Sequence, residues 1–156
     1  MDSQTPLTTV EKAAFLTEVD LFRDVPSDTL AEMAARMEEG WHGPGDVLLE
    51  PDMPEVRLFV ILSGRVQVTR GDEARPDLGR GDALGLLASL GLPQLETHTV
   101  AESCRTLSVG PDEYLDAIAD STAFAIANLL ALGRRVRACE QELRMHVPLP
   151  RGGDTR

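Results

Sequence analysis

The spacing of apolar residues changes from a helical period to a two-residue period near Trp41 and changes back after Gly110. Between these two points, short apolar or alternating runs are separated by turns that contain glycine and proline. Short strands at close spacing with such turns are typical of a small β-barrel or jelly roll. The chain is therefore expected to be an α+β protein in which helices flank a barrel.

Individual elements follow from the same patterns. Helices are expected at residues 10–17, 27–40, 111–120 and 121–145. Strands are expected at residues 47–50, 58–62, 65–70, 97–101 and 105–109. Ser27 is a suitable N-cap for the second helix, and Gly40 is expected to close it. Ser63–Gly64 is expected to form a tight turn between two strands, and Asp120 or Ser121 is expected to cap the last helix.

The composition favours one acidic domain. The chain has 156 residues, a net charge of −11 and 42% hydrophobic residues, which suffices for a single core. Residues 134–156 carry six arginines against three acidic residues, whereas the rest of the chain carries nine lysines or arginines against 23 acidic residues. Because net negative charge repels phosphate, a nucleic-acid partner is not expected. We expect a domain at 10–146 between flexible ends at 1–9 and 147–156.

The sequence predicts a cytoplasmic protein. Residues 1–11 are polar, unlike a signal peptide, and the longest apolar run, 123–133, is too short to cross a bilayer. The two cysteines have no metal-ligand spacing, and the three histidines are scattered along the chain. No metal site and no catalytic residues are expected, so a metal-dependent cupin-like barrel enzyme is only a minor alternative.

One stretch has the pattern of an anion-binding loop. Gly81-Asp82 is a turn dipeptide, Gly85 follows it, and residues 86–90 are small or apolar and suit one helical turn. Free backbone N–H groups at the start of a helix attract an anion, and glycine allows the anion to approach closely. This stretch is therefore the candidate ligand site.

The order of these elements resembles the cyclic-nucleotide-binding domain, which is the sensor module of catabolite-activator-type regulators, protein kinase A regulatory subunits and nucleotide-gated channels. The resemblance covers residues 10–145, and its most specific segments are Pro44-Gly45-Asp46-Val47 and Ile61-Leu62-Ser63-Gly64-Arg65-Val66. It implies a jelly roll with N-terminal helices, a long C-terminal helix and a regulatory role in signalling. The helix-turn-helix of the activators is not expected, because only about ten residues follow the last helix.

The resemblance fails at the phosphate cassette. In the family, Gly-Glu-Leu-Ala is followed by Pro-Arg-x-Ala-Thr; the Glu holds the ribose 2′-hydroxyl and the Arg pairs with the cyclic phosphate. Here Leu86 stands at the Glu position, and Gln94 follows Pro93 where the family has Arg. A one-residue shift offers only Leu95. The candidate ligand-binding residues of this degenerate cassette are Gly85, Leu86, Leu87, Ala88, Gln94, Thr97 and His98.

These departures predict a stand-alone regulatory or adaptor protein that is not an enzyme and acts through protein contacts, alone or on a larger assembly. No cofactor is expected and tight cyclic AMP binding is not expected, although the amides of residues 86–88 could hold an anion weakly. The alternative is a small-molecule or cyclic-nucleotide sensor with a rewired pocket. In that case Thr97, His98, Arg80 or an arginine of the last helix would replace the missing Arg.

The last helix also carries an apolar series at heptad spacing. Its members are Leu129, Leu132, Val136, Cys139 and Leu143. Two interpretations are open, because the helix can pack on its own barrel or can form a symmetric homodimer with a second copy. We expect the homodimer.

Overall fold

The computed structural model describes residues 5–146. The elements, in chain order, are α1 (Thr9–Leu16), η2 (Asp20–Phe22), α2 (Ser27–Arg36), β1 (Glu38–His42), β2 (Val47–Leu49), β3 (Leu58–Arg70), β4 (Glu73–Leu78), β5 (Ala83–Leu84), α3 (Leu86–Ser89), β6 (Thr97–Val109), α4 (Pro111–Asp120) and α5 (Thr122–His146). The expected C-terminal tail and residues 1–4 of the expected N-terminal end lie outside the described part of the chain.

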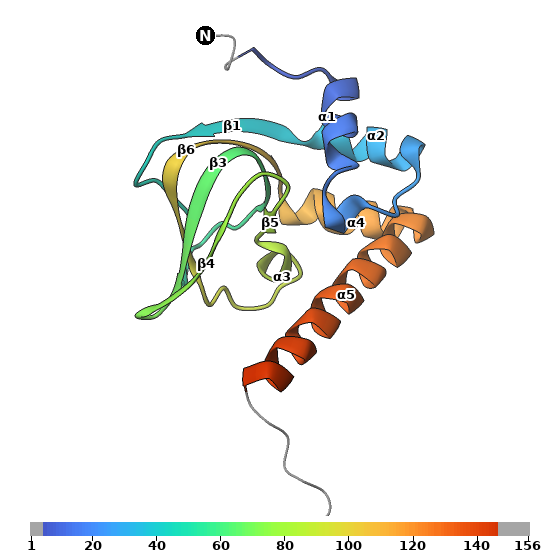
Figure 1. Cartoon of the computed structure of the whole chain (residues 1–156). Helices are drawn as coiled ribbons and strands as arrows, with labels where there is room; N and C mark the ends of the chain where they lie inside the picture. Colours follow the sequence, from blue (N-terminus) through green and yellow to red (C-terminus); the bar gives the residue numbers. More distant parts are fainter. Residues whose placement is uncertain (1–4, 147–156) are drawn as a thin grey trace, which may run out of the picture.

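The strands form one curled antiparallel sheet. Their order is β1-β6-β3-β4, with β2 paired to β6 and β5 paired to β3. Figure 1 shows the sheet curled into a barrel on one side of the molecule, with α1, α2, α4 and α5 on the other. The α+β jelly-roll architecture with N-terminal helices and a long C-terminal helix is therefore confirmed.

Strands β3 and β6 are longer than the sequence pattern predicts. The expected turn at Ser63–Gly64 is wrong, because β3 runs through it, and β6 likewise runs through the expected break between 101 and 105. The pairing of β3 with β6 shifts register around Ser63 and Arg65, so the extra backbone is absorbed in bulges. Gly64 has φ 98°, and a Cβ there would lie 2.3 Å from the carbonyl oxygen of Ser103. The glycine therefore serves close strand approach and not a turn.

The helix caps are confirmed in part. Helix α2 ends at Arg36, and Gly40 lies inside β1, so the expected closure of the helix by Gly40 is wrong. A Cβ at Gly40 would lie 2.8 Å from His42 Nε2, which explains a glycine in that strand. Ser27 is the first residue of α2 and not its N-cap. Ser121 does cap α5, because its Oγ accepts a hydrogen bond from the Phe124 amide at 3.1 Å.

Two apolar clusters form the core. One lies between the helices and one face of the sheet, and its fully buried members include Leu16, Phe22, Leu58, Tyr114 and Phe124. The other fills the barrel, and it consists of Leu48, Leu49, Phe59, Ile61, Val66, Leu84, Val100 and Cys104. The alternation along β3, in which Leu58 and Val60 face the helices and Phe59 and Ile61 face the barrel, divides the core in this way.

Buried polar contacts and surface ion pairs fix the direction of α5. The Tyr114 hydroxyl donates to Asn128 Oδ1 at 2.6 Å, and Asn128 Nδ2 donates to the Phe124 carbonyl at 2.7 Å. Burial raises the pKa of Tyr114 well above its ordinary value, so the hydroxyl stays a donor. Further along α5, Arg134 pairs with Asp20 at 3.2 Å and with Asp24 at 3.1 Å. The first half of α5 is therefore held against α4 and η2.

We predict that Tyr114→Phe lowers the free energy of unfolding by about 1–3 kcal/mol, because it leaves the buried Asn128 oxygen without its donor. Urea denaturation at neutral pH measures the change. An unfolding free energy equal to that of the wild type would show that the hydrogen bond does not stabilise the α4–α5 junction.

Candidate functional site

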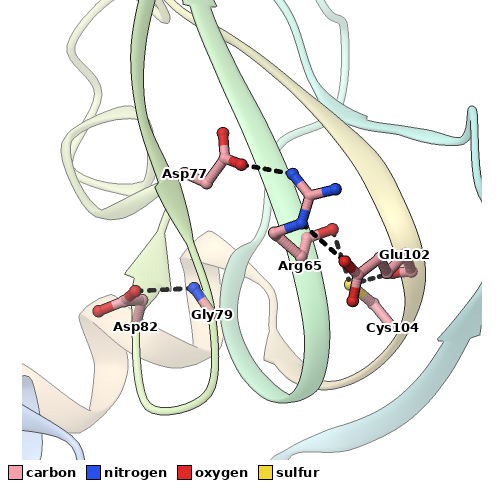
Figure 2. A network of polar contacts seen from close by, with 6 residues as sticks. All are labelled: Arg65, Asp77, Gly79, Asp82, Glu102 and Cys104. Carbon is pink, nitrogen blue, oxygen red and sulfur yellow. Dashed lines mark hydrogen bonds and ion pairs between the residues drawn. The ribbon is translucent and has the colours of Figure 1, made fainter.

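The cassette follows a turn that is anchored to the sheet. The Gly81 amide donates to the Ile61 carbonyl at 2.9 Å, and the Ile61 amide donates to the Asp82 carbonyl at 3.0 Å. The Asp82 carboxylate accepts from the Gly79 amide at 2.8 Å, as Figure 2 shows. These contacts set the chain direction into β5 and then into Gly85.

A polar network ties the neighbouring strands together beside this turn (Figure 2). Arg65 on β3 pairs with Asp77 on β4 and, through Nε at 2.9 Å, with Glu102 on β6. The buried Cys104 thiol donates to the Glu102 carbonyl at 3.2 Å. Burial raises the pKa of Cys104, so this thiol is protonated and unreactive at neutral pH. The network is a structural support for the bulge and not a reactive centre.

Gly85 keeps the backbone geometry that a cradle for an anion needs. It precedes α3 with φ 87°, and a Cβ at this position would lie 2.2 Å from the Arg57 carbonyl oxygen. No other residue type fits without displacing β3 from β5. The first amides of α3, at residues 86–88, have no intrahelical acceptors, which is the feature that attracts an anion.

The side chains of α3 do not form a polar site. Leu86 and Ser89 are almost fully buried, and Leu86 belongs to the core between the helices and the sheet. Leu87 is 51% exposed. The position where the resemblance would place a ribose-binding Glu therefore holds a core leucine that faces away from solvent.

The loop after α3 is closed on itself. Gln94 Nε2 donates to the Glu96 carbonyl at 2.8 Å and lies 3.4 Å from His98 Nδ1. His98 is 5% exposed, and its Nε2 lies 3.8 Å from Glu96 Oε1. Burial lowers the pKa of His98, so its ring is neutral at neutral pH. The structure thus brings Gln94 and His98 together but occupies them with each other and with Glu96.

Two of the other suggested replacements for the missing Arg, Arg80 and Arg134, have partners elsewhere. Arg80 donates to the Leu62 carbonyl at 3.0 Å, pairs with Glu18 at 3.3 Å and covers the ring of Phe15. Arg134 of α5 is paired with Asp20 and Asp24. Thr97 lies at the start of β6 opposite Thr69. The role of these residues in ligand binding stays a prediction.

Two described cavities lie away from the cassette helix. One of about 410 Å³ is lined by Trp41, His42, Gly43, Ser63, Ser103, Cys104 and Arg105. One of about 150 Å³ lies between η2, the Gly81 turn and α5. Within residues 5–146, no group of three or more His, Cys, Asp or Glu side chains is placed to hold a metal ion. In the same range no single helix is long and apolar enough to cross a membrane, although α4 and α5, bent by 113°, pass together by length and composition.

Several solved structures have the same overall fold as this chain. The N-terminal domain of a transcriptional regulator from Streptomyces coelicolor A3(2) matches with a TM-score of 0.69 and 25% identity, over 81% of this chain and 95% of that chain. A putative cyclic nucleotide binding protein from Ruegeria pomeroyi matches with a TM-score of 0.71 and 13% identity, over 89% of this chain and 64% of that chain. The regulatory domain of Toxoplasma gondii PKA, crystallised with cAMP, matches with a TM-score of 0.63 and 22% identity, over 70% of this chain and 44% of that chain. This is the cyclic-nucleotide-binding fold.

A curated relative agrees with the cyclic-nucleotide-binding fold. A cGMP-dependent protein kinase from Caenorhabditis elegans is 28% identical over 95 residues, which are 57% of this chain. The match covers 12% of the kinase, so the chain corresponds to a small part of that enzyme. No protein-family model matches the chain.

We predict that Gly85→Ala destabilises the protein by more than about 3 kcal/mol, because it adds a steric clash to an unfavourable φ. Gly91→Ala is a matched control, since Gly91 has φ 97° but a Cβ added there would meet no atom within 4 Å. Gly91→Ala should lower the free energy of unfolding by only about 1–2 kcal/mol. Chemical denaturation of both variants measures the difference, and equal losses would show that the approach of Arg57 to Gly85 is not required.

The buried His98 predicts a pH dependence of stability. The unfolded chain binds a proton near the ordinary pKa of 6.5, whereas the folded chain does not, because burial lowers the pKa of His98. The contribution of the neutral His98 to the free energy of unfolding is therefore complete above pH 6.5, and it decreases as the pH falls below 6.5. His42, whose pKa burial also lowers, acts in the same direction. We predict that His98→Gln reduces the loss of stability between about pH 7.5 and pH 5.5, as measured by urea denaturation. An unchanged loss would contradict a neutral buried His98.

Proposed function

We propose that this chain is a regulatory or adaptor protein of the cyclic-nucleotide-binding fold that does not bind a cyclic nucleotide tightly and acts through protein contacts. The proposed role is non-enzymatic, and it applies to the domain formed by residues 5–146.

The observation that carries the proposal is the charge of the cassette. From Gly85 to Val100 the chain contains no lysine or arginine, and its one acidic residue is Glu96. The Glu96 carboxylate lies beside the neutral ring of His98. A cyclic phosphate that approached the amides of α3 would therefore meet no cation in this segment and would meet one like charge.

The energetic consequence is large. Removing one partner of a buried ion pair costs about 3–5 kcal/mol. At about 1.4 kcal/mol for each factor of ten, the affinity falls by roughly two to four orders of magnitude. The backbone amides of α3 remain, but hydrogen bonds from neutral donors are weaker than a bidentate arginine pair. Tight binding of a cyclic nucleotide is therefore not expected.

Isothermal titration with cyclic AMP, cyclic GMP and cyclic dinucleotides tests the proposal. We predict no binding at micromolar ligand concentration by this chain. The regulatory domain of T. gondii PKA, whose structure contains cAMP, serves as the positive control. Micromolar binding of any of these nucleotides to this chain would contradict the proposal.

A rewired sensor is the second candidate, because Gly85 retains the backbone shape of the cradle. The same titrations separate the two functions when they are paired with thermal unfolding. In a rewired sensor, a nucleotide would raise the melting temperature, and Thr97→Val or His98→Gln would remove that rise. Without any such rise in the wild type, the rewired pocket has no support.

A further inference from the structure

We propose that the cavity beside β1 is a binding site for a small aromatic monocarboxylate, in which Arg105 would bind the carboxylate and Trp41 would contact the ring. The cavity has a volume of about 410 Å³, and its lining comes from β1, the residue that follows β1, β3 and β6. Small-molecule sites have volumes of about 300–1,000 Å³. No residue of the cassette lines this cavity, so the site is separate from the one that the cyclic-nucleotide-binding fold implies and goes beyond the proposed function.

The strand register brings the polar and aromatic groups of the cavity together. Arg105 on β6 is paired with Trp41 on β1 on one side and with Ser63 on β3 on the other. Directly paired residues of antiparallel strands project from the same face of a sheet. Ser103 belongs to the bulged part of β6 next to Arg105, and it lines the same cavity. The cavity therefore combines one indole, one guanidinium and two hydroxyl groups.

Arg105 is fixed by an ion pair with Glu39, whose side chain is only 8% exposed. Its Nε and Nη2 both donate to Glu39 Oε2, at 3.1 and 2.8 Å, and Nη2 also donates to the Thr5 carbonyl. The other Glu39 oxygen accepts from the Leu7 amide. Arg105 Nη1 makes no hydrogen bond with the part of the chain that the structure describes. The guanidinium thus has a fixed position and one nitrogen whose hydrogens are left for a ligand.

Trp41 supplies an aromatic wall for the cavity. It is 43% exposed, and Arg105 Cζ lies 5.3 Å from the centroid of its ring. A cation–π contact of this kind stabilises the position of both side chains. Because aromatic rings pack favourably in edge-to-face and offset arrangements, the exposed part of the indole favours a ligand with an aromatic ring.

The groups that remain for a ligand are hydrogen-bond donors. Ser63 and Ser103 are exposed, and their hydroxyls make no hydrogen bond within residues 5–146. With Arg105 Nη1, they can offer guanidinium and hydroxyl hydrogens to one acceptor group. A carboxylate accepts several hydrogen bonds at once. A bond from guanidinium to carboxylate is also roughly twice as strong as one between neutral groups. The donor set therefore favours a carboxylate over a neutral carbonyl group.

The charge around the cavity favours a single negative charge on the ligand. Arg105 is the cation of the lining, because burial lowers the pKa of His42 and leaves that ring neutral. Two neighbouring carboxylates are engaged elsewhere: Glu102 pairs with Arg65 at 2.9 Å, and Asp46 accepts from a backbone amide at 2.9 Å. A phosphate dianion would bring a second negative charge to a chain of net charge −11, which repels it.

An NMR titration of the whole chain with benzoate tests the proposal. Trp41 is the only tryptophan of the 156 residues, so its indole N–H gives a single resonance that reports on the cavity. Benzoate is expected to shift this resonance with a dissociation constant of at most about 1 mM. Benzamide has the same ring without the charge and should bind at least about tenfold more weakly. Inorganic phosphate should cause no shift below about 10 mM.

Two substitutions in the lining should each weaken benzoate binding by at least about tenfold. Ser63→Leu removes a donor and occupies part of the cavity, whereas Arg105→Lys keeps the charge and loses the planar guanidinium. Gln67→Leu is the matched control, because Gln67 is also exposed on β3 but lies outside the cavity lining, and it should bind benzoate as the wild type does. Urea denaturation shows whether each variant is folded. Ser63 is exposed and outside the Glu39 ion pair, so its substitution tests the site even if Arg105→Lys is unfolded.

An indole resonance that benzoate leaves unchanged up to about 10 mM would overturn the proposal. A folded Ser63→Leu variant that binds benzoate as tightly as the wild type would overturn it as well. Equal affinities for benzoate and benzamide would overturn the assignment of a carboxylate ligand.

Discussion

The pairing of β3 with β6 is the constraint on which the rest of the structure depends. The two strands pair from Leu58 and Val109 to Thr69 and Thr97, and their alternating residues supply both apolar clusters. The pairing requires Gly64, because a side chain at that position would meet the backbone of Ser103 and Cys104. The turn that leads into the cassette is bonded to Ile61 of β3, so the candidate site takes its position from the same strand.

The backbone shape of the cassette and its electrostatics depend on different residues of this chain. The backbone of the cassette depends on Gly85 and on the turn around Asp82, and both are retained. Its electrostatics depend on side chains, and those are neutral or acidic from Gly85 to Val100. Gln94, Glu96 and His98 contact one another within the loop that follows α3. A scaffold shared with nucleotide-binding domains is therefore compatible with a surface that contacts protein.

The architecture could be predicted from the sequence because it depends on periodicity and on glycine and proline, which act locally. The continuation of β3 through Ser63 could not, since Ser-Gly suits a turn locally and the strand is imposed by pairing with β6. The prediction for Gly40 is wrong because it too rested on a local pattern. A glycine after a helical pattern suggests a C-cap, whereas Gly40 lies in β1 and leaves space for the His42 side chain. At the candidate site, the lack of an arginine is visible in the sequence. The closure of the loop by Gln94 and Glu96 depends on side-chain geometry that no pattern encodes.

The anchoring of α5 at only one end makes the helix a lever. Its first half is fixed by the Tyr114–Asn128 hydrogen bond and by Arg134 on η2, and the remaining turns have no support from the described body of the protein. A rotation of about 10° at these anchors would displace the far end, roughly 16 Å away, by nearly 3 Å. A small rearrangement of η2 would thus cause a larger displacement of the C-terminal end of α5 and of any molecule bound to it.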